Sequence, residues 1–362
     1  MPFQLRFSRH NLQFKFDART SRGSLTSHTA YYLKLSDPKN PEITGWGEAA
    51  PLEGLSVDFR PDFEEKIEAF CQTFNAQKHS VFSNAESWLW EQDLHDLPAL
   101  KFAVETALLD FKNGGKKIIF DTEFTQGETG IPINGLVWMG DEKFMQQQIL
   151  QKLDQGYDCL KLKIGGLDFE TELKILASVR AMAPPEKLQI RLDANGAFSP
   201  KDALEKLSKL AAFSVHSLEQ PIKPNQYAAM KKICAESPIP IALDEELIGV
   251  TDMVVQQKML DQIRPQFIIL KPTLLGGLQA SKKWIALAEE RNIGWWITSA
   301  LESNIGLNAI AQFTSTFSNL IPQGLGTGQL YHNNIPSPLL IEKGYLFYRK
   351  NLGWQTEILA GN

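Results

Sequence analysis

The hydrophobic and polar residues at the start of the chain follow a pattern typical of antiparallel β-strands. Apolar and polar side chains alternate with a period of two in three segments: 3–8, 12–17 and 30–35. Such alternation places one row of side chains on a buried face. The polar, glycine-containing segment 20–27 separates the last two of these segments, and the turn-rich segment 45–52 closes the meander.

Helical patterns follow the predicted strands. Residues 62–79 and 98–113 carry apolar side chains at helical spacing, and the second segment ends at two glycines. We therefore predict an α+β capping domain over residues 1–125. The tail, residues 331–362, returns to short alternating segments and is expected to pack back on this domain.

Between residues 126 and 330, short β-branched runs alternate with amphipathic segments, as in successive βα units. Eight strands are predicted, the number in a (β/α)8 barrel: 131–137, 159–164, 188–193, 215–219, 239–244, 266–271, 294–299 and 323–327. One helix is predicted over 200–211, with Ser199 as its N-cap and Pro200 at its first position. The predicted fold class is thus α/β, a modified TIM barrel joined to an α+β capping domain.

Composition and charge exclude several classes of function and partner. The net charge of −5, with both signs mixed, argues against a nucleic-acid partner. No apolar run reaches the roughly 20 residues that span a bilayer, and the start lacks the pattern of a signal peptide. Cys71, Cys159 and Cys234 are odd in number and scattered, which argues against a disulfide framework. We expect a cytoplasmic protein without a membrane partner; a homo-oligomer is left open.

Metal and nucleotide motifs of the common kinds are missing from the sequence. None of the six histidines forms an H-x-x-x-H pair, and no C-x-x-C occurs, so a zinc site has little support. The glycine-rich segment 324–328 fits neither the P-loop nor the dinucleotide-binding pattern. An oxygen-ligand metal site remains the leading hypothesis.

Charged residues stand at the ends of successive predicted strands. They are Lys161 and Lys163, Asp193, Glu219, Asp244 and Lys271. From Lys163 onward they are spaced about 25 to 30 residues apart, the length of one βα unit. The carboxyl ends of barrel strands converge, so we expect three anions flanked by cations at one point.

Each of these signals has a simpler explanation when taken alone. The two lysines could guard a solvent-exposed edge strand, and Asp193 could belong to a plain turn. Glu219 could be a surface carboxylate, and Asp244 could begin an acidic helix. Their joint occurrence at barrel spacing is what favours a site.

Three carboxylates suit Mg²⁺, a hard cation with octahedral geometry. Such a metal can hold a substrate carboxylate and stabilise the enediolate formed when the neighbouring proton is removed. Lys163 and Lys271 could serve the two faces of that carbon. Two neighbouring ammonium groups also lower the pKa of one of them, as a lysine base requires.

The motifs K-x-K, D-A-N, E-Q-P, D-E and K-P at these intervals resemble the muconate-lactonizing subgroup of the enolase superfamily over nearly the whole chain. Sites of that superfamily combine a lysine or histidine base with Mg²⁺. The resemblance implies that Asp193, Glu219 and Asp244 bind Mg²⁺, with Mn²⁺ as a substitute. It also implies that Lys163 is the principal acid/base, Lys271 the opposing lysine and Lys161 the assistant of Lys163.

Four segments are similar to those of o-succinylbenzoate synthases: 20–23, 191–198, 297–307 and 324–330. This resemblance implies that Ser299 lies near the succinyl end of the substrate and Arg191 beside its ring carboxylate. Asn195, on the face of Asp193, is also expected to bind substrate. Arg22 either closes over the substrate or is a solvent-exposed loop arginine. Glu302 is expected to orient Lys271 or a loop backbone.

The resemblance implies a carbon–oxygen lyase for a small-molecule carboxylate. The expected reaction is the syn-dehydration of 2-succinyl-6-hydroxy-2,4-cyclohexadiene-1-carboxylate to 2-succinylbenzoate in menaquinone biosynthesis. The alternatives are an N-succinylamino acid racemase or a dipeptide epimerase that uses Lys163 and Lys271 as two bases, and a non-catalytic binding barrel. Dipeptide epimerases typically carry D-x-D on the last strand, where this sequence has Gly326-Thr327-Gly328.

Overall fold

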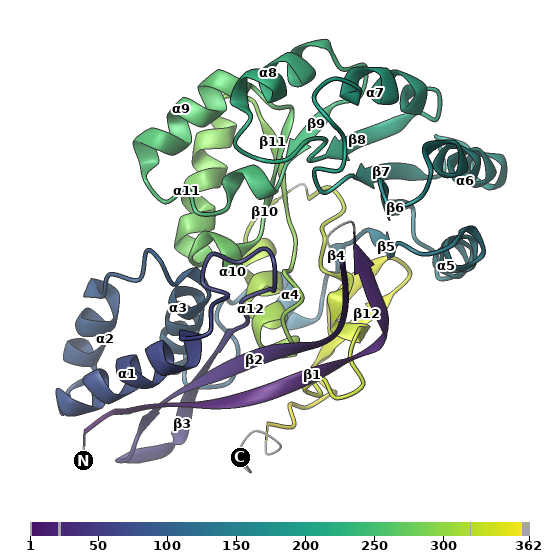
Figure 1. Cartoon of the computed structure of the whole chain (residues 1–362). Coiled ribbons are helices and arrows are strands. Elements are labelled where there is room, and N and C mark those ends of the chain that lie inside the picture. The colour runs from purple at the N-terminus through teal and green to yellow at the C-terminus, as the bar shows by residue number, and fades with distance from the viewer. Residues whose placement is uncertain (1, 21–22, 319, 357–362) are drawn as a thin grey trace.

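The computed structural model describes residues 2–20, 23–318 and 320–356. An antiparallel sheet in the order β1-β2-β3 lies beside the barrel (Figure 1). Its strands are β1 (Gln4–Thr20), β2 (Gly23–Asp37) and β3 (Asn40–Ala49). The prediction of two separate strands before residue 18 was wrong, because β1 continues through a register irregularity between Gln13 and Ala18. The segment 45–52 is also not wholly a connection, since β3 extends to Ala49.

Three helices pack with this sheet: α1 (Phe63–Ala76), α2 (Phe82–Glu91) and α3 (Pro98–Lys112). Helix α3 approaches β3 closely, because a Cβ atom at Gly47 would lie only 1.9 Å from the carbonyl oxygen of Ala103. The helices α1 and α3 were expected from sequence. Helix α2 was not, since it is only 10 residues long and buries only two side chains.

Seven parallel strands form the barrel sheet in chain order, from β5 to β11. They are β5 (Gly135–Val137), β6 (Cys159–Lys163), β7 (Gln189–Asp193), β8 (Val215–Glu219), β9 (Ile241–Leu243), β10 (Phe267–Leu270) and β11 (Gly294–Ile297). Each lies within a segment that the alternating pattern predicted. The modified barrel with a separate antiparallel sheet confirms the predicted fold class.

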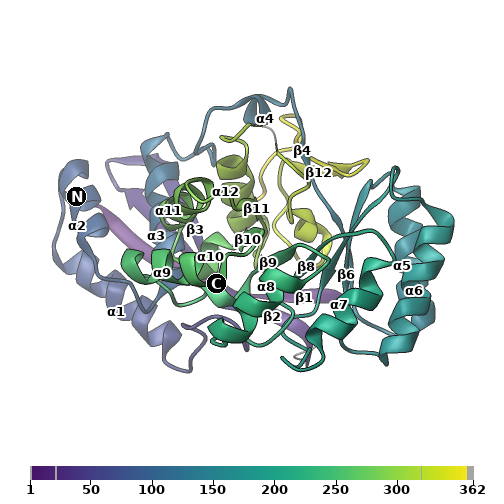
Figure 2. The same cartoon turned by 90° about the horizontal axis from the view of Figure 1, so that it is seen from above.

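Helices connect and surround these strands, as the view from above shows (Figure 2). They are α5 (Glu142–Asp154), α6 (Phe169–Met182), α7 (Ala203–Ala211), α8 (Tyr227–Glu236), α9 (Met253–Ile263), α10 (Pro272–Leu275), α11 (Leu278–Glu289) and α12 (Asn304–Thr314). Helix α7 begins at Ala203, so Ser199 is not its N-cap as predicted. Instead the hydroxyl and backbone N–H of Ser199 donate to Asp202 Oδ1, both at 2.9 Å, in the preceding turn.

The eighth predicted strand, 323–327, is shorter than expected. Gln323 bridges Ile133 and Gly324 bridges Thr298, which joins the two edges of the seven-stranded sheet. A short 3-10 helix, η2 (Gly326–Gln329), then begins. Glycines at 324, 326 and 328 weaken an extended strand, because they add no side chain to pack and cost conformational entropy. The ring therefore closes through two residues.

The segments after η2 contact both parts of the molecule. Phe14 of β1 pairs with Tyr331, and the N–H of His332 donates to Gln13. Strands β12 (Leu339–Glu342) and β13 (Tyr345–Tyr348) instead form a sheet with β4 (Ile131–Pro132), just before the barrel. The division at residues 125 and 330 stays a prediction. Within the described ranges, every helix is too short or too polar to cross a bilayer.

Candidate active site

The parallel register aligns the charged residues at the carboxyl ends of the barrel strands. Lys163 of β6 lies opposite Asp193 of β7, and Asp193 lies opposite Glu219 of β8. Lys161 is two residues before Lys163, so both side chains point to the same face of the strand. All four side chains are buried. The structure therefore brings these predicted residues together.

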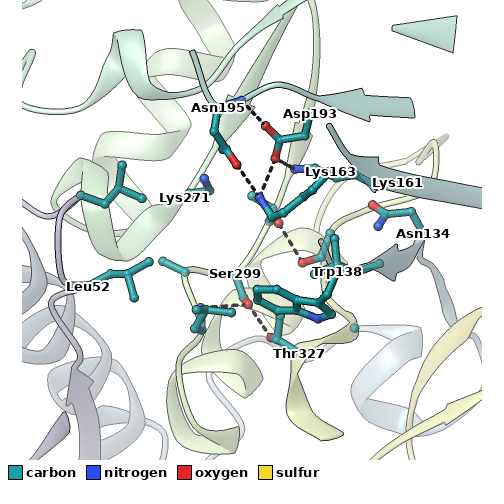
Figure 3. A pocket seen from close by; sticks show the side chains of 17 residues that line it. Leu52, Asn134, Trp138, Lys161, Lys163, Asp193, Asn195, Lys271, Ser299 and Thr327 are labelled. Carbon is teal, nitrogen blue, oxygen red and sulfur yellow. Dashed lines mark hydrogen bonds and ion pairs between the residues drawn. The ribbon is translucent and has the colours of Figure 1, made fainter. Parts of the chain in front are cut away.

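Direct ion pairs connect the lysines and carboxylates (Figure 3). Lys163 Nζ lies 2.9 Å from Asp193 Oδ2 and donates to Asn195 Oδ1 at 2.8 Å. Lys161 Nζ lies 3.0 Å from Asp193 Oδ2 and 2.5 Å from Glu219 Oε2. On the other side of the site, Lys271 pairs with Asp244 Oδ2. Two buried groups of ion pairs thus contain all six charged residues expected from sequence.

The two neighbouring lysines differ in their affinity for a proton. Burial opposes the charged form of Lys161, but the carboxylates of Asp193 and Glu219 outweigh it and raise the pKa of this ammonium. For Lys163, burial lowers the pKa; the Lys161 ammonium adds to this, and Asp193 opposes it. Lys163 is therefore the residue of the pair that more readily becomes a neutral base.

The donor chemistry of the carboxylates fits a hard divalent cation. Glu219 is 2% exposed, and its Oε1 atom has no hydrogen-bond partner. Burial and the Asp193 carboxylate raise the pKa of Glu219, which indicates negative charge that the lysines only partly offset. In the described part of the chain these side chains are paired with lysines, and no group of three potential ligands is already gathered around one point.

The cavity at these ion pairs also receives residues from outside the barrel strands. Leu52 and Leu55 of the capping region line it, together with Trp138 and Thr327. Sequence reasoning did not identify Leu52, Leu55 and Trp138 as site residues, because an apolar side chain on a loop gives no local signal of a site. Two predicted substrate-binding residues, Asn195 and Ser299, also line the cavity. The Ser299 hydroxyl forms a hydrogen bond with the Thr327 hydroxyl.

Arg191 lies deeper in the barrel than Asp193. Its guanidinium lies 4.2 Å from the centre of the Trp296 ring, and Nη1 donates to Pro322 O at 2.7 Å. Arg191 is two residues before Asp193 on β7, which puts it one layer deeper in the barrel, and it is not among the residues that line the cavity. Its expected contact with substrate stays a prediction. Arg22 lies outside the described residues.

Glu302 orients the loop backbone rather than Lys271. It is fully buried, accepts a hydrogen bond from the N–H of Ala300 at 2.8 Å and accepts another from the Thr273 hydroxyl. These contacts hold the turn that carries Ser299 against the residues after β10. From the sequence, Glu302 could orient either Lys271 or a loop backbone, and these hydrogen bonds favour the loop backbone.

The fold and this site define the class of protein. Residues 145–359 match the family described as enolase C-terminal domain-like. The chain belongs to the enolase superfamily, and it is an enzyme of that superfamily.

Individual enzymes of the superfamily differ in how similar they are to this chain. An o-succinylbenzoate synthase from Desulfotalea psychrophila is 46% identical over 95% of this chain and 98% of that protein. The crystal structure of MenC from the same organism superposes with a TM-score of 0.83 at 43% identity, covering 96% of this chain and 100% of that one. The L-Ala-D/L-Glu epimerase from Bacillus subtilis is 26% identical over 82% of this chain and 80% of that protein.

Proposed function

We propose that the chain is an o-succinylbenzoate synthase, a dehydratase that forms 2-succinylbenzoate from its hydroxylated cyclohexadiene precursor. The structural observation that supports this proposal is the buried Lys163, which faces the cavity beside Asp193 and opposite Lys271 (Figure 3). The identity of 46% to a synthase over 95% of the chain supports the same reaction. We place this step in menaquinone biosynthesis and in the cytoplasm on the strength of the reaction alone.

We further propose that Asp193, Glu219 and Asp244 hold Mg²⁺, with Mn²⁺ as a substitute. The support is the all-oxygen donor set and the unpartnered Oε1 of Glu219. A divalent cation at these carboxylates would supply positive charge to the carboxylate of a bound substrate and so favour loss of the neighbouring proton.

Lys163 performs the proton transfers in this proposal. Its neutral amine removes the proton next to the ring carboxylate, and the electrons of the C–H bond pass into that carboxylate. The Lys163 ammonium then donates the proton to the departing hydroxide on the same face, so that one water leaves and the ring becomes aromatic. Lys161 keeps its charge beside Asp193 and Glu219, which favours the neutral form of Lys163 before the reaction.

Lys271 needs no proton transfer in this reaction. Its pairing with Asp244 keeps it protonated, since the carboxylate outweighs burial and raises the pKa of Lys271. A fixed ammonium on the opposite face stabilises the negative charge that develops on the substrate. Lys271 therefore acts as an electrostatic group in a dehydration.

A racemase of N-succinylamino acids is the second candidate, because Lys163 and Lys271 lie on opposite sides of the cavity (Figure 3). A dipeptide epimerase fits less well. Among the described residues that line the cavity, Asp193 is the only carboxylate, and two lysines already pair with it. A cationic amino group would find no free counter-ion there.

The test is the loss of ultraviolet absorbance when the protein and Mg²⁺ meet the cyclohexadiene carboxylate. We expect Lys163→Ala to lower kcat by about 10²- to 10⁴-fold, the usual contribution of a general base. Lys231→Ala, an exposed change on α8, is the control and should leave kcat unchanged. If the folded wild-type protein consumes no diene but exchanges the α-proton of N-succinylamino acids with deuterium, the racemase is correct.

A further inference from the structure

A second cavity adjoins the active site. It encloses about 300 Å³ between β1, helix α5 and the segment that contains η2. Five residues line both cavities: Asn134, Leu136, Trp138, Gly326 and Thr327. The two cavities therefore share part of their lining.

The charged side chains of this second cavity have one sign. Lys15 and Lys152 line it, and no carboxylate does among the described residues. Lys152 is half-buried, and its contacts are the Tyr157 ring, centred 4.9 Å from Nζ, and Gln155 Oε1 at 3.4 Å. Burial lowers the pKa of Lys152, as expected for an ammonium without a nearby acid. This cavity is suited to an anion.

Asn134 provides a second, independent sign of a ligand. The residue is 4% exposed, faces both cavities, and its Oδ1 atom has no hydrogen-bond partner. A buried amide without a partner is costly, because its hydration is lost and not replaced. Since Oδ1 accepts, a hydrogen-bond donor that enters with a ligand, a hydroxyl or a water, would replace the lost hydration, while the Nδ2 group of the same amide can donate to a carbonyl oxygen.

The volume of the active-site cavity also indicates that a substrate extends into the second cavity. It encloses about 90 Å³, whereas ligand pockets commonly enclose about 300–1,000 Å³. Together the two cavities reach this range. A substrate with the ring at Lys163 thus needs the second cavity for its side chain.

We propose that the second cavity is the subsite for the second carboxylate of the substrate, with Lys152 as its counter-ion and the Asn134 side-chain amide donating, through Nδ2, to the keto group between the two ends. This inference rests on the proposed function, since only a dicarboxylate places an anion there. Thr327, which faces both cavities, connects this subsite to Ser299 through their hydroxyl hydrogen bond.

The test compares two ligands on the Mg²⁺-loaded protein by calorimetry. The first is 2-succinylbenzoate; the second is 2-butyrylbenzoate, which keeps the ring carboxylate and keto group but lacks the terminal carboxylate. We expect Lys152→Met to raise the Kd of 2-succinylbenzoate about tenfold or more, because charge-assisted hydrogen bonds are strong, and to leave 2-butyrylbenzoate unchanged. Lys152→Arg should restore most of the lost affinity. Asn134→Ala should weaken both ligands, because both carry the keto group.

Lys143→Met, an exposed change on the same helix, is the control and should affect neither ligand. An unchanged Kd for 2-succinylbenzoate in Lys152→Met, or equal weakening of both ligands, would overturn the subsite. This failure differs from failure of the proposed function. Wild-type protein that consumes the diene, with an unchanged KM in Lys152→Met, refutes only the subsite, whereas wild-type protein without turnover refutes the function itself.

Discussion

Replacing Glu48 by glutamine tests how the capping sheet is held against the barrel. Glu48 belongs to β3 and is fully buried. Its carboxylate accepts hydrogen bonds from the N–H of Ser303 at 2.7 Å, the hydroxyl of Ser303 at 2.6 Å and the N–H of Gly306 at 2.7 Å. These donors lie at the start of α12, which follows the turn that carries Ser299. Burial nevertheless raises the pKa of Glu48 to about 7, against the effect of the hydrogen bonds.

The raised pKa makes the contribution of Glu48 to stability depend on pH. The ordinary value is 4.5, so between that pH and about 7 the unfolded chain loses a proton that the folded chain keeps. The stability from this group is complete below pH 4.5 and is lost as the pH rises through 7. At about 1.36 kcal/mol per pKa unit, the loss between pH 5 and pH 8 is about 2–3 kcal/mol. Glutamine cannot ionise, so the Glu48→Gln variant does not lose this stability as the pH rises.

The assay is urea unfolding in EDTA, followed by circular dichroism at pH 5 and pH 8. Other buried acids such as Glu105 change with pH in both proteins, so they cancel in the difference between wild type and Glu48→Gln. We expect that difference to shift by about 2–3 kcal/mol in favour of the variant at pH 8. Glu42→Gln changes an exposed carboxylate of the same strand and should show no shift.

One result would refute this reasoning. If wild type keeps the same advantage over Glu48→Gln at both pH values, Glu48 is ionised throughout, and its three hydrogen bonds outweigh the cost of burial. The capping sheet would then be held by a carboxylate anion at the start of α12, where the helix dipole favours negative charge.

Two further predictions concern packing and the metal. Gly47→Ala should destabilise the protein by about 1–3 kcal/mol, seen as a lower Tm in calorimetry, because the new Cβ would lie 1.9 Å from Ala103 O; Gly353→Ala, with open space around it, should have almost no effect. Adding Mg²⁺ to EDTA-treated protein at about 100 times its Kd should stabilise the fold by about 2.7 kcal/mol and raise Tm. Glu219→Gln should remove this rise, and a full rise in that variant would contradict the proposed ligands.

The sequence by itself determined the barrel and its charged centre. Seven strands lie within the predicted segments, and Lys161, Lys163, Asp193 and Glu219 meet as expected. This was possible because the βα repeat is a local pattern, and parallel strands carry the residues at their carboxyl ends to one edge. Element lengths were less predictable, as β1 and the two-residue closure at Gln323 show, because pairing with neighbouring strands decides them.

Only the tertiary structure decided which residues surround that centre. Leu52 reaches the cavity from the capping region, Lys152 reaches the adjoining cavity from α5, and Glu48 contacts α12 from a strand more than 250 residues earlier. No periodicity encodes such contacts, since each depends on how segments that are far apart in the sequence pack against one another. Arg191 shows the same limit, because its position two residues before Asp193 fixes its face and its layer in the barrel but not the groups that its guanidinium contacts. Those groups, the Trp296 ring and Pro322 O, come from later strands and loops, and the packing of the closed sheet brings them to Arg191.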